Sequence, residues 1–239
     1  MSQNLRHRGA DPEDERAFSP AALPVLRQAT GDLGWLLDRG YALASAADLV
    51  ANRYKLTARQ RLALGRCACA SEDRERRRQR RLTLEQLRGQ ELWIDGFNVM
   101  TALESALGGG IILISGDGCC RDVAGLHRRY HKVVETIPAL QLAGRFMAQA
   151  GISKALWWLD SPIANSGRLK KIILDAAQQE HWNWQVELAT NPDRVLSQAE
   201  HVVATADRVI LDRCQRWFNL AREVIAACIP AAKIIDLSG

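Results

Sequence analysis

The stretch ELWIDGFNV, residues 91–99, decides the fold of the larger part of this chain. It joins a short apolar segment, Leu92–Ile94, to an aspartate, Asp95, and then to a glycine. A short apolar run bounded by turn-forming residues is typical of a buried strand. Two later segments repeat the pattern of a strand followed by an aspartate: Ala155–Leu159 before Asp160, and Val202–Thr205 ahead of Asp207.

Three further apolar runs predict strands, and helical patterns separate the strands along the chain. The strands are expected at Ile111–Ile114, Trp184–Leu188 and Lys233–Leu237. The helices are expected at Val123–Ala150, with a break near Pro138, at Ser166–Glu180 and at Arg213–Ala227. Strands that alternate with helices usually form parallel sheets. Residues 91–239 are therefore predicted to be an α/β domain, a mostly parallel sheet with helices on both faces.

The chain before residue 91 has a helical pattern. We expect residues 1–17 to be poorly ordered, residues 18–73 to form a small all-helical domain, and residues 74–90 to form an Arg-rich helix or linker. Thr57 is suited to cap a helix over Ala58–Ala70. The tight turn before this helix resembles a helix-turn-helix, although any compact three-helix domain has the same pattern.

The net charge is concentrated in the first third of the chain. The sequence contains 32 Lys+Arg and 27 Asp+Glu, a formal net charge of +5. Residues 1–91 contain 17 basic and 12 acidic side chains, whereas residues 92–239 contain 15 of each. The run RERRRQRR at residues 74–81 therefore either binds an anionic partner or forms a solvated helical face or hinge. Its candidates for binding nucleic acid are Arg74, Arg76, Arg77, Arg78, Arg80 and Arg81.

The sequence also indicates a compartment. No apolar run approaches the roughly 18 residues that span a bilayer, and the N-terminus has no apolar stretch of the signal-peptide kind. We therefore expect a cytoplasmic protein without a membrane partner. The six cysteines contain no CxxC pair, so buried reduced thiols are expected rather than a zinc site.

Four aspartates are expected to meet at one edge of the sheet. Asp95, Asp160 and Asp207 follow strands, and Asp193 lies in the loop after the strand that ends at Leu188. Ligands of open α/β sheets bind beyond the carboxyl ends of the strands. Crowded carboxylates repel one another, and oxygen ligands of this kind favour Mg²⁺ or Mn²⁺. Each aspartate taken alone has a second interpretation, as a helix cap or a turn residue.

Two segments carry a resemblance to a known class of enzymes. IDGFNV, residues 94–99, resembles the opening strand of PIN-like nucleases, especially of their NYN branch. VVATADRVIL, residues 202–211, resembles the late element in which a strand leads into Thr-Ser-Asp-Arg, with Ala206 where Ser is common. Asp193 and the strand end at Asp160 fit the same pattern. The resemblance covers about residues 91–237.

The whole chain resembles a second family more closely. Its N-terminal part is similar to domain of unknown function 434, in HRGADPEDERAFSPAALP and YKLTARQRLAL. Its C-terminal part is similar to domain of unknown function 5616, in WIDGFNV, GDGCCRD, NSGRL, NPDR and ILDRC. This second resemblance implies no particular activity.

The PIN-like resemblance implies a Rossmann-like sheet and metal-assisted phosphodiester hydrolysis, with RNA favoured as the substrate. Asp95, Asp160, Asp193 and Asp207 would hold Mg²⁺ or Mn²⁺ and carry the catalysis. The N–H groups that open the helix at Ser166, together with a nearby arginine, would suit a phosphate, or they form a plain helix start. The candidates for substrate binding are Asn98, Asn165, Ser166, Arg168 and Thr205.

Three functions remain open at this point. The first is a Mg²⁺- or Mn²⁺-dependent nuclease with a basic helical accessory domain. The second is a nucleic-acid-binding or interaction protein whose PIN-like domain is catalytically silent, which fits the neutral charge of residues 92–239. The third is a phosphohydrolase that acts on small molecules at the same edge of the sheet.

Overall fold

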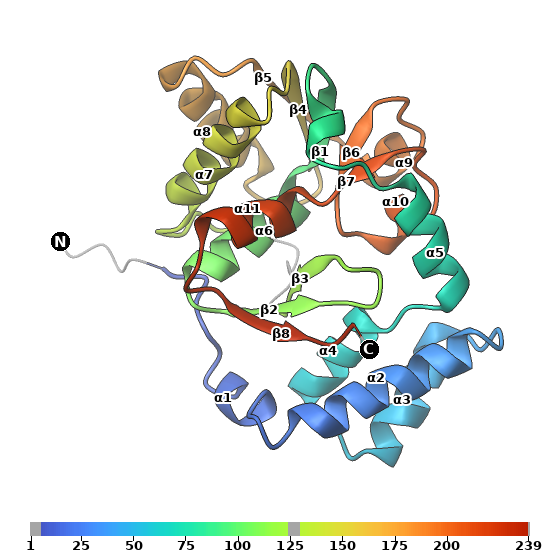
Figure 1. Ribbon diagram of the computed structural model, residues 1–239. Coiled ribbons are helices and arrows are strands. Elements are labelled where there is room, and N and C mark those ends of the chain that lie inside the picture. The colour runs from blue at the N-terminus through green and yellow to red at the C-terminus, as the bar shows by residue number, and fades with distance from the viewer. Residues whose placement is uncertain (1–5, 124–129, 239) are drawn as a thin grey trace.

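A computed structural model describes residues 6–123 and 130–238 of the chain. A helical region comes first, and a parallel sheet surrounded by helices follows it, as the sequence predicts (Figure 1). The helices of the first region are α1 (Asp14–Ala17), α2 (Leu23–Leu37), α3 (Leu43–Arg53), α4 (Ala58–Cys67) and α5 (Ser71–Arg80), with a short 3-10 turn at Glu85–Leu87. None of the helices in the described part of the chain combines the length and apolarity that a bilayer crossing requires.

The main sheet has five parallel strands in the order β5-β4-β1-β6-β7. Its strands are β1 (Glu91–Asp95), β4 (Lys154–Asp160), β5 (Trp184–Ala189), β6 (Val202–Ala204) and β7 (Trp217–Phe218). Leu92 of the central strand pairs with Ala155 on one side and with Val202 on the other. This register brings the carboxyl ends of β1, β4 and β6 to the same edge of the sheet.

Helices cover both faces of the sheet because residues of each strand alternate between two hydrophobic cores. Ile94 belongs to the larger core, together with residues of α6 (Gly96–Leu107), α7 (Thr136–Gln149), α8 (Ser166–Gln179) and α11 (Leu220–Cys228). Trp93 packs on the opposite face, against residues of α9 (Pro192–Ser197) and α10 (Arg208–Leu211). This alternation is the period-2 pattern of a strand that is buried on both sides.

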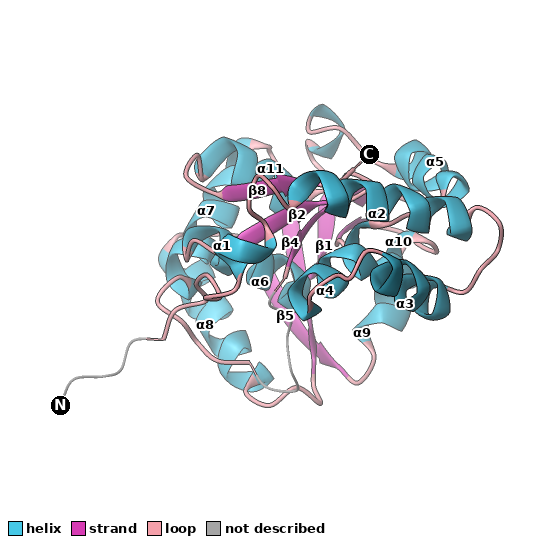
Figure 2. Cartoon of the chain, turned by 90° about the horizontal axis from the view of Figure 1, so that it is seen from below, coloured by secondary structure: helices cyan, strands magenta, loops and turns pink. Residues whose placement is uncertain are grey.

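A second sheet joins the helical region to the rest of the molecule. It contains β2 (Ile111–Ile114), β3 (Cys120–Asp122) and β8 (Lys233–Asp236), in the order β3-β2-β8. Leu113 of β2 and Leu237 share one core with Leu26, Leu33 and Leu64 of helices α2 and α4. Figure 2 shows these helices lying across the second sheet. The helical region therefore completes its core with strands from the other end of the chain.

The described part of the N-terminal segment, residues 6–17, is anchored by polar contacts with distant parts of the chain. Arg8 donates from Nε to the buried Glu104 at 2.6 Å, and Arg59 forms an ion pair with the buried Asp14. His7 lies 2.7 Å from Glu135. The polar side chains of this segment thus supply partners for buried charges.

Two predicted helices begin later than expected. α7 begins at Thr136, with Pro138 in its first turn, where proline is tolerated. Residues 130–135 are not helical, and residues 124–129 lie outside the described part. α11 begins at Leu220, because Trp217 and Phe218 form β7 and pair with β6. A strand of two residues is too short to leave a pattern in the sequence.

Candidate functional site

The four predicted aspartates line one cavity of about 600 Å³ at the carboxyl ends of the strands. Asp95 ends β1, Asp160 ends β4, and Asp207 follows β6 directly before α10. Asp193 lies in the first turn of α9. The helical region also contributes to this cavity, through Leu43, Gly65 and Arg66. The cavity is therefore built by both regions of the chain.

A chain of hydrogen bonds fixes Asp95 at the base of the cavity. The hydroxyl of Thr205 donates to Asp95 Oδ2 at 2.7 Å, and the backbone N–H of Asp207 donates to the Thr205 oxygen at 3.0 Å. The side-chain oxygen of Asn98 accepts from the backbone N–H of Ala206 at 3.0 Å. Two of the five predicted substrate contacts, Asn98 and Thr205, thus join β1 and α6 to the loop after β6 near Asp95, and of these two Asn98 lines the cavity.

Burial and the negative charge of neighbouring carboxylates raise the pKa values of three aspartates in the cavity. Burial, together with the negative charges of Asp207 and Asp193, raises the pKa of Asp95 to about 7, although the Thr205 hydrogen bond acts in the opposite direction. Burial and the charge of Asp193 raise the pKa of Asp160. Burial and the charge of Asp207 raise the pKa of Asp193. Raised carboxyl pKa values of this kind indicate that too little positive charge lies beside these carboxylates to balance them.

The alternative interpretation as helix caps holds for one of these aspartates. Asp207 accepts from the backbone N–H groups of Val209, at 2.8 Å, and Ile210, at 3.4 Å, and therefore caps α10. Asp95 occupies the corresponding position before α6; its side chain forms no cap hydrogen bond within ordinary distance limits, although the backbone N–H of Asn98 acts to lower its pKa. Capping therefore accounts for the place of Asp207 and contributes only weakly at Asp95.

The donor chemistry of the cavity suits a hard cation, but the aspartates do not form a closed metal cage. Five aspartates line the cavity. Asp122 pairs with Arg66, whereas among the described residues none of the four predicted aspartates forms an ion pair. Carboxylate oxygens are the ligands that Mg²⁺ prefers. Across residues 6–123 and 130–238, however, no three His, Cys, Asp or Glu side chains are grouped as metal ligands. The four aspartates fit the ion in chemical type and line one cavity, but no three of them lie close enough together to hold it as they stand.

Basic side chains line the same cavity, and sequence reasoning missed them as site residues. They are Arg66 of α4, Arg121 of β3 and Arg208 of α10. Arg66 forms an ion pair with Asp122 at 3.1 Å, and Arg121 forms one with Asp117 at 2.7 Å. Arg208 had a local signal, because it follows Asp207 in the quoted motif at residues 202–211, whereas Arg66 and Arg121 lie far from the four predicted aspartates in the sequence. The cavity is therefore acidic on part of its wall and basic on another part.

The predicted phosphate site at the start of α8 lies outside this cavity. Asn165, Ser166 and Arg168 are not among the residues that line it, although Ile163 is. Asn165 has a left-handed backbone, with φ of 74°, and donates from Nδ2 to the Tyr130 carbonyl at 2.7 Å. Its amide therefore closes the loop before α8. A phosphate-binding role for this segment stays a prediction.

The arginine run is mostly bound within the protein. Arg77 is buried, and it pairs with Asp117 at 2.6 Å and with Asp212 at 2.7 Å. Arg77 is therefore not accessible to a nucleic acid. Other members of the run are engaged as well: Arg76 with Asp73 and Asp212, Arg78 with Glu75, Arg80 with the carbonyls of Asp212 and Cys214, and Arg81 with Glu223. Arg74 is exposed.

These contacts attach α5 to the α/β part of the chain. The Arg77 carbonyl accepts from the indole N–H of the buried Trp217 at 2.7 Å, and Leu82 donates to the Trp217 carbonyl at 2.8 Å. Asp117 lies in a turn and accepts from both Arg77 and Arg121. Much of the net charge of residues 74–81 thus neutralises acids of the larger region.

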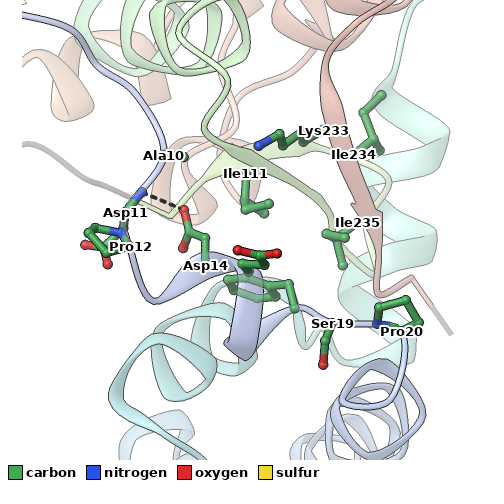
Figure 3. A pocket seen from close by; sticks show the side chains of 12 residues that line it. Ala10, Asp11, Pro12, Asp14, Ser19, Pro20, Ile111, Lys233, Ile234 and Ile235 are labelled. Carbon is green, nitrogen blue, oxygen red and sulfur yellow. Dashed lines mark hydrogen bonds between the residues drawn. The ribbon is translucent and has the colours of Figure 1, made fainter.

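A larger cavity, of about 720 Å³, lies between the N-terminal segment and β8 (Figure 3). Its wall combines apolar residues such as Ile111 and Ile235 with Asp11, Asp14 and Lys233. Asp14 accepts there from the backbone N–H of Asp11 at 3.0 Å and also pairs with Arg59. The polar groups of this cavity thus serve the packing of α1, so the chemistry of the molecule is better sought in the aspartate-lined cavity.

Comparison with known proteins identifies the family. Residues 84–223 match the family described as a domain of unknown function, DUF5616, and residues 25–80 match the protein of unknown function DUF434. The chain belongs to the DUF5616 family. An uncharacterised protein of Methanocaldococcus jannaschii is 30% identical to it over 186 residues, which cover 78% of this chain and 88% of the relative. No solved structure matches the chain.

This family membership confirms the closer of the two resemblances seen in the sequence. The boundary between the two matched segments, at residues 80–84, falls where α5 ends and the larger region begins. The family descriptions assign no activity. The resemblance to PIN-like nucleases therefore stays a prediction that rests on the motifs and on the aspartates of the cavity.

Proposed function

We propose that this protein is a Mg²⁺- or Mn²⁺-dependent phosphodiester hydrolase. The observation that supports this most is the shared cavity of Asp95, Asp160, Asp193 and Asp207 at the carboxyl ends of β1, β4 and β6. An ionised carboxylate is costly when it is buried, and more so beside other carboxylates without a cation; burial first and then these charges raise the pKa of Asp95. RNA is the favoured substrate because the motifs at residues 94–99 and 202–211 resemble those of PIN-like nucleases, and that resemblance implies RNA.

The four aspartates would hold the ion. When bound, the ion would neutralise phosphate charge and make a water molecule more acidic. Thr205 holds Asp95 in one orientation through its 2.7 Å hydrogen bond, and Asn98 holds the loop that carries Asp207. Arg121, fixed by Asp117 and by the Ala206 carbonyl, supplies a positive charge on the cavity wall that would attract a phosphate.

The test is cleavage of labelled single-stranded RNA and DNA by the purified full chain in Mn²⁺ or Mg²⁺. We expect RNA cleavage that EDTA abolishes. Asp193→Asn should lower the cleavage rate by about two orders of magnitude, which is the usual effect of losing one essential electrostatic contact in an active site. Asp193 is suited to this change because its residue is exposed, so the fold should tolerate asparagine.

The matched control is Asp175→Asn, which removes one exposed carboxylate of α8 outside the cavity. It should cleave RNA at the wild-type rate. The proposal fails if the wild type cleaves neither RNA nor DNA with either ion, or if Asp193→Asn and Asp175→Asn have equal activity.

A second candidate function is nucleic-acid binding by a catalytically silent protein. It is favoured by the finding that no three potential ligands are grouped as a metal site within the described residues. Binding would then survive Asp95→Asn and Asp207→Asn. It should weaken in an Arg74→Gln, Arg78→Gln double variant, which changes the exposed members of the arginine run and spares the buried Arg77. Unchanged affinity and salt dependence in that variant would exclude this function for the run.

A further inference from the structure

Arg208 carries a charge that the protein leaves without an ion pair. Among the described residues, its one hydrogen bond runs from Nη2 to the Ala68 carbonyl at 2.6 Å, and no carboxylate forms an ion pair with it. A guanidinium has five N–H donors, so most of those of Arg208 remain available. The neighbouring Arg66, Arg77 and Arg121 are each paired with an aspartate.

No carboxylate of the described residues pairs with Arg208, although Asp207 precedes it in the chain and lines the same cavity. Asp117 is the carboxylate whose negative charge acts most strongly on Arg208. It is, however, already paired with Arg77 at 2.6 Å and with Arg121 at 2.7 Å. Burial, and then the positive charge of Arg121, lower the pKa of Arg208. A partly buried cation beside another cation favours an anionic ligand.

Arg208 also lines the cavity that contains the four aspartates. The four aspartates of that wall are therefore carboxylates without a paired cation, and Arg208 is a cation without a paired carboxylate, among the described residues. A phosphate group accompanied by a divalent cation would supply both. Arginine suits such a ligand because its planar fork can bind two phosphate oxygens at once.

We propose that Arg208, supported by Arg121, binds a phosphate group of the RNA substrate inside the aspartate-lined cavity. This inference rests on the proposed function for the identity of the substrate. It also gives the helical region a part in the site, since Arg208 is fixed by the carbonyl of Ala68, directly after α4.

The test is equilibrium binding of a short fluorescein-labelled oligouridylate to the full chain in EDTA, where metal-dependent cleavage cannot occur. Arg208→Gln should weaken binding about tenfold, the scale of one charge-assisted hydrogen bond. The slope of log affinity against log salt should fall by about 0.7, the contribution of one phosphate of a single strand. Asp193→Asn should instead tighten binding, because it removes a negative charge from the same cavity.

The matched control is Arg213→Gln, which removes one exposed arginine outside the cavity lining. It should leave the affinity and the salt slope unchanged. The inference is overturned if Arg208→Gln binds as the wild type does, or if Arg213→Gln weakens binding as much as Arg208→Gln.

A second pair of variants keeps the test decisive if Arg208→Gln does not fold. Val209 lines the same cavity and is 47% exposed, so the fold should accept a polar side chain there. Val209→Glu should weaken oligouridylate binding relative to Val209→Gln, and equal affinities would overturn the inference. The cleavage assay reports separately on the proposed function, because these binding differences are measured without metal.

Discussion

Replacing Asp95 by asparagine should stabilise the protein at alkaline pH. The buried carboxyl of Asp95 has an ordinary pKa of 3.8, and in the folded protein its pKa is raised to about 7. A carboxyl with a raised pKa favours folding while it is protonated, so its contribution to the free energy of unfolding falls as the pH rises from about 4 to about 7. Asparagine has nearly the same shape, stays neutral and can still accept from Thr205.

The magnitude follows from the size of the shift. A difference of about three pKa units corresponds to about 4 kcal/mol of destabilisation once the carboxylate is ionised in both states, above pH 7. At pH 4.5 the same relation gives about 1 kcal/mol. The free energy of unfolding of Asp95→Asn, minus that of the wild type, should therefore be about 3 kcal/mol larger at pH 8 than at pH 4.5. Any constant effect of the amide cancels in this comparison.

The assay is urea denaturation followed by tryptophan fluorescence, in EDTA, at both pH values. Asp175→Asn serves as the control, because that residue lies on the exposed side of α8. Its stability relative to the wild type should be nearly the same at both pH values. A pH-independent effect of Asp95→Asn, or a loss of stability at pH 8, would refute the electrostatic description of the cavity.

Three further substitutions test the packing around the site. Gly96→Ala should cost about 1–3 kcal/mol by urea denaturation, because a Cβ would lie 2.5 Å from Leu159; a neutral effect would mean that the start of α6 can shift. Arg77→Met should cost about 1.5–3 kcal/mol, because it removes one of the two arginines that pair with the buried Asp117. The exposed Arg78→Met should cost less than about 1 kcal/mol, and equal costs would contradict the assignment of Arg77 to the interior. Thr57→Ala should lower the thermal stability by about 1 kcal/mol through loss of the capping box, and no change would show that the cap is dispensable.

The sequence predicted the strand ends well because those features are local. The strand at Leu92–Ile94, the aspartate after it and the Thr57 cap each follow from residues that are neighbours in the chain. Parallel strands then bring Asp95, Asp160 and Asp207 to one edge without further information. The meeting of these residues in one cavity could therefore be predicted from the pattern of the chain.

The features that the sequence did not predict depend on distant contacts. The arginine run has the composition of a nucleic-acid-binding segment, but the acids that bind it include Asp117, Asp212 and Glu223, far along the chain. The basic wall of the cavity takes residues from α4, β3 and α10, which no single motif joins. Ile111–Ile114 was predicted as a strand, but its place in a second sheet depends on pairing with Lys233–Asp236. Local patterns therefore indicate the acidic part of the site and Arg208 beside it, but not Arg66 or Arg121.

Binding of Mn²⁺ by isothermal titration calorimetry tests the central claim most directly. The wild type should bind Mn²⁺, and Asp95→Asn and Asp193→Asn should each weaken that binding at least about tenfold, as loss of a charged ligand implies. Asp175→Asn should bind as the wild type does. A wild-type protein that binds no Mn²⁺, or variants of Asp95 and Asp193 that bind it equally well, would contradict the assignment of the four aspartates to a metal site.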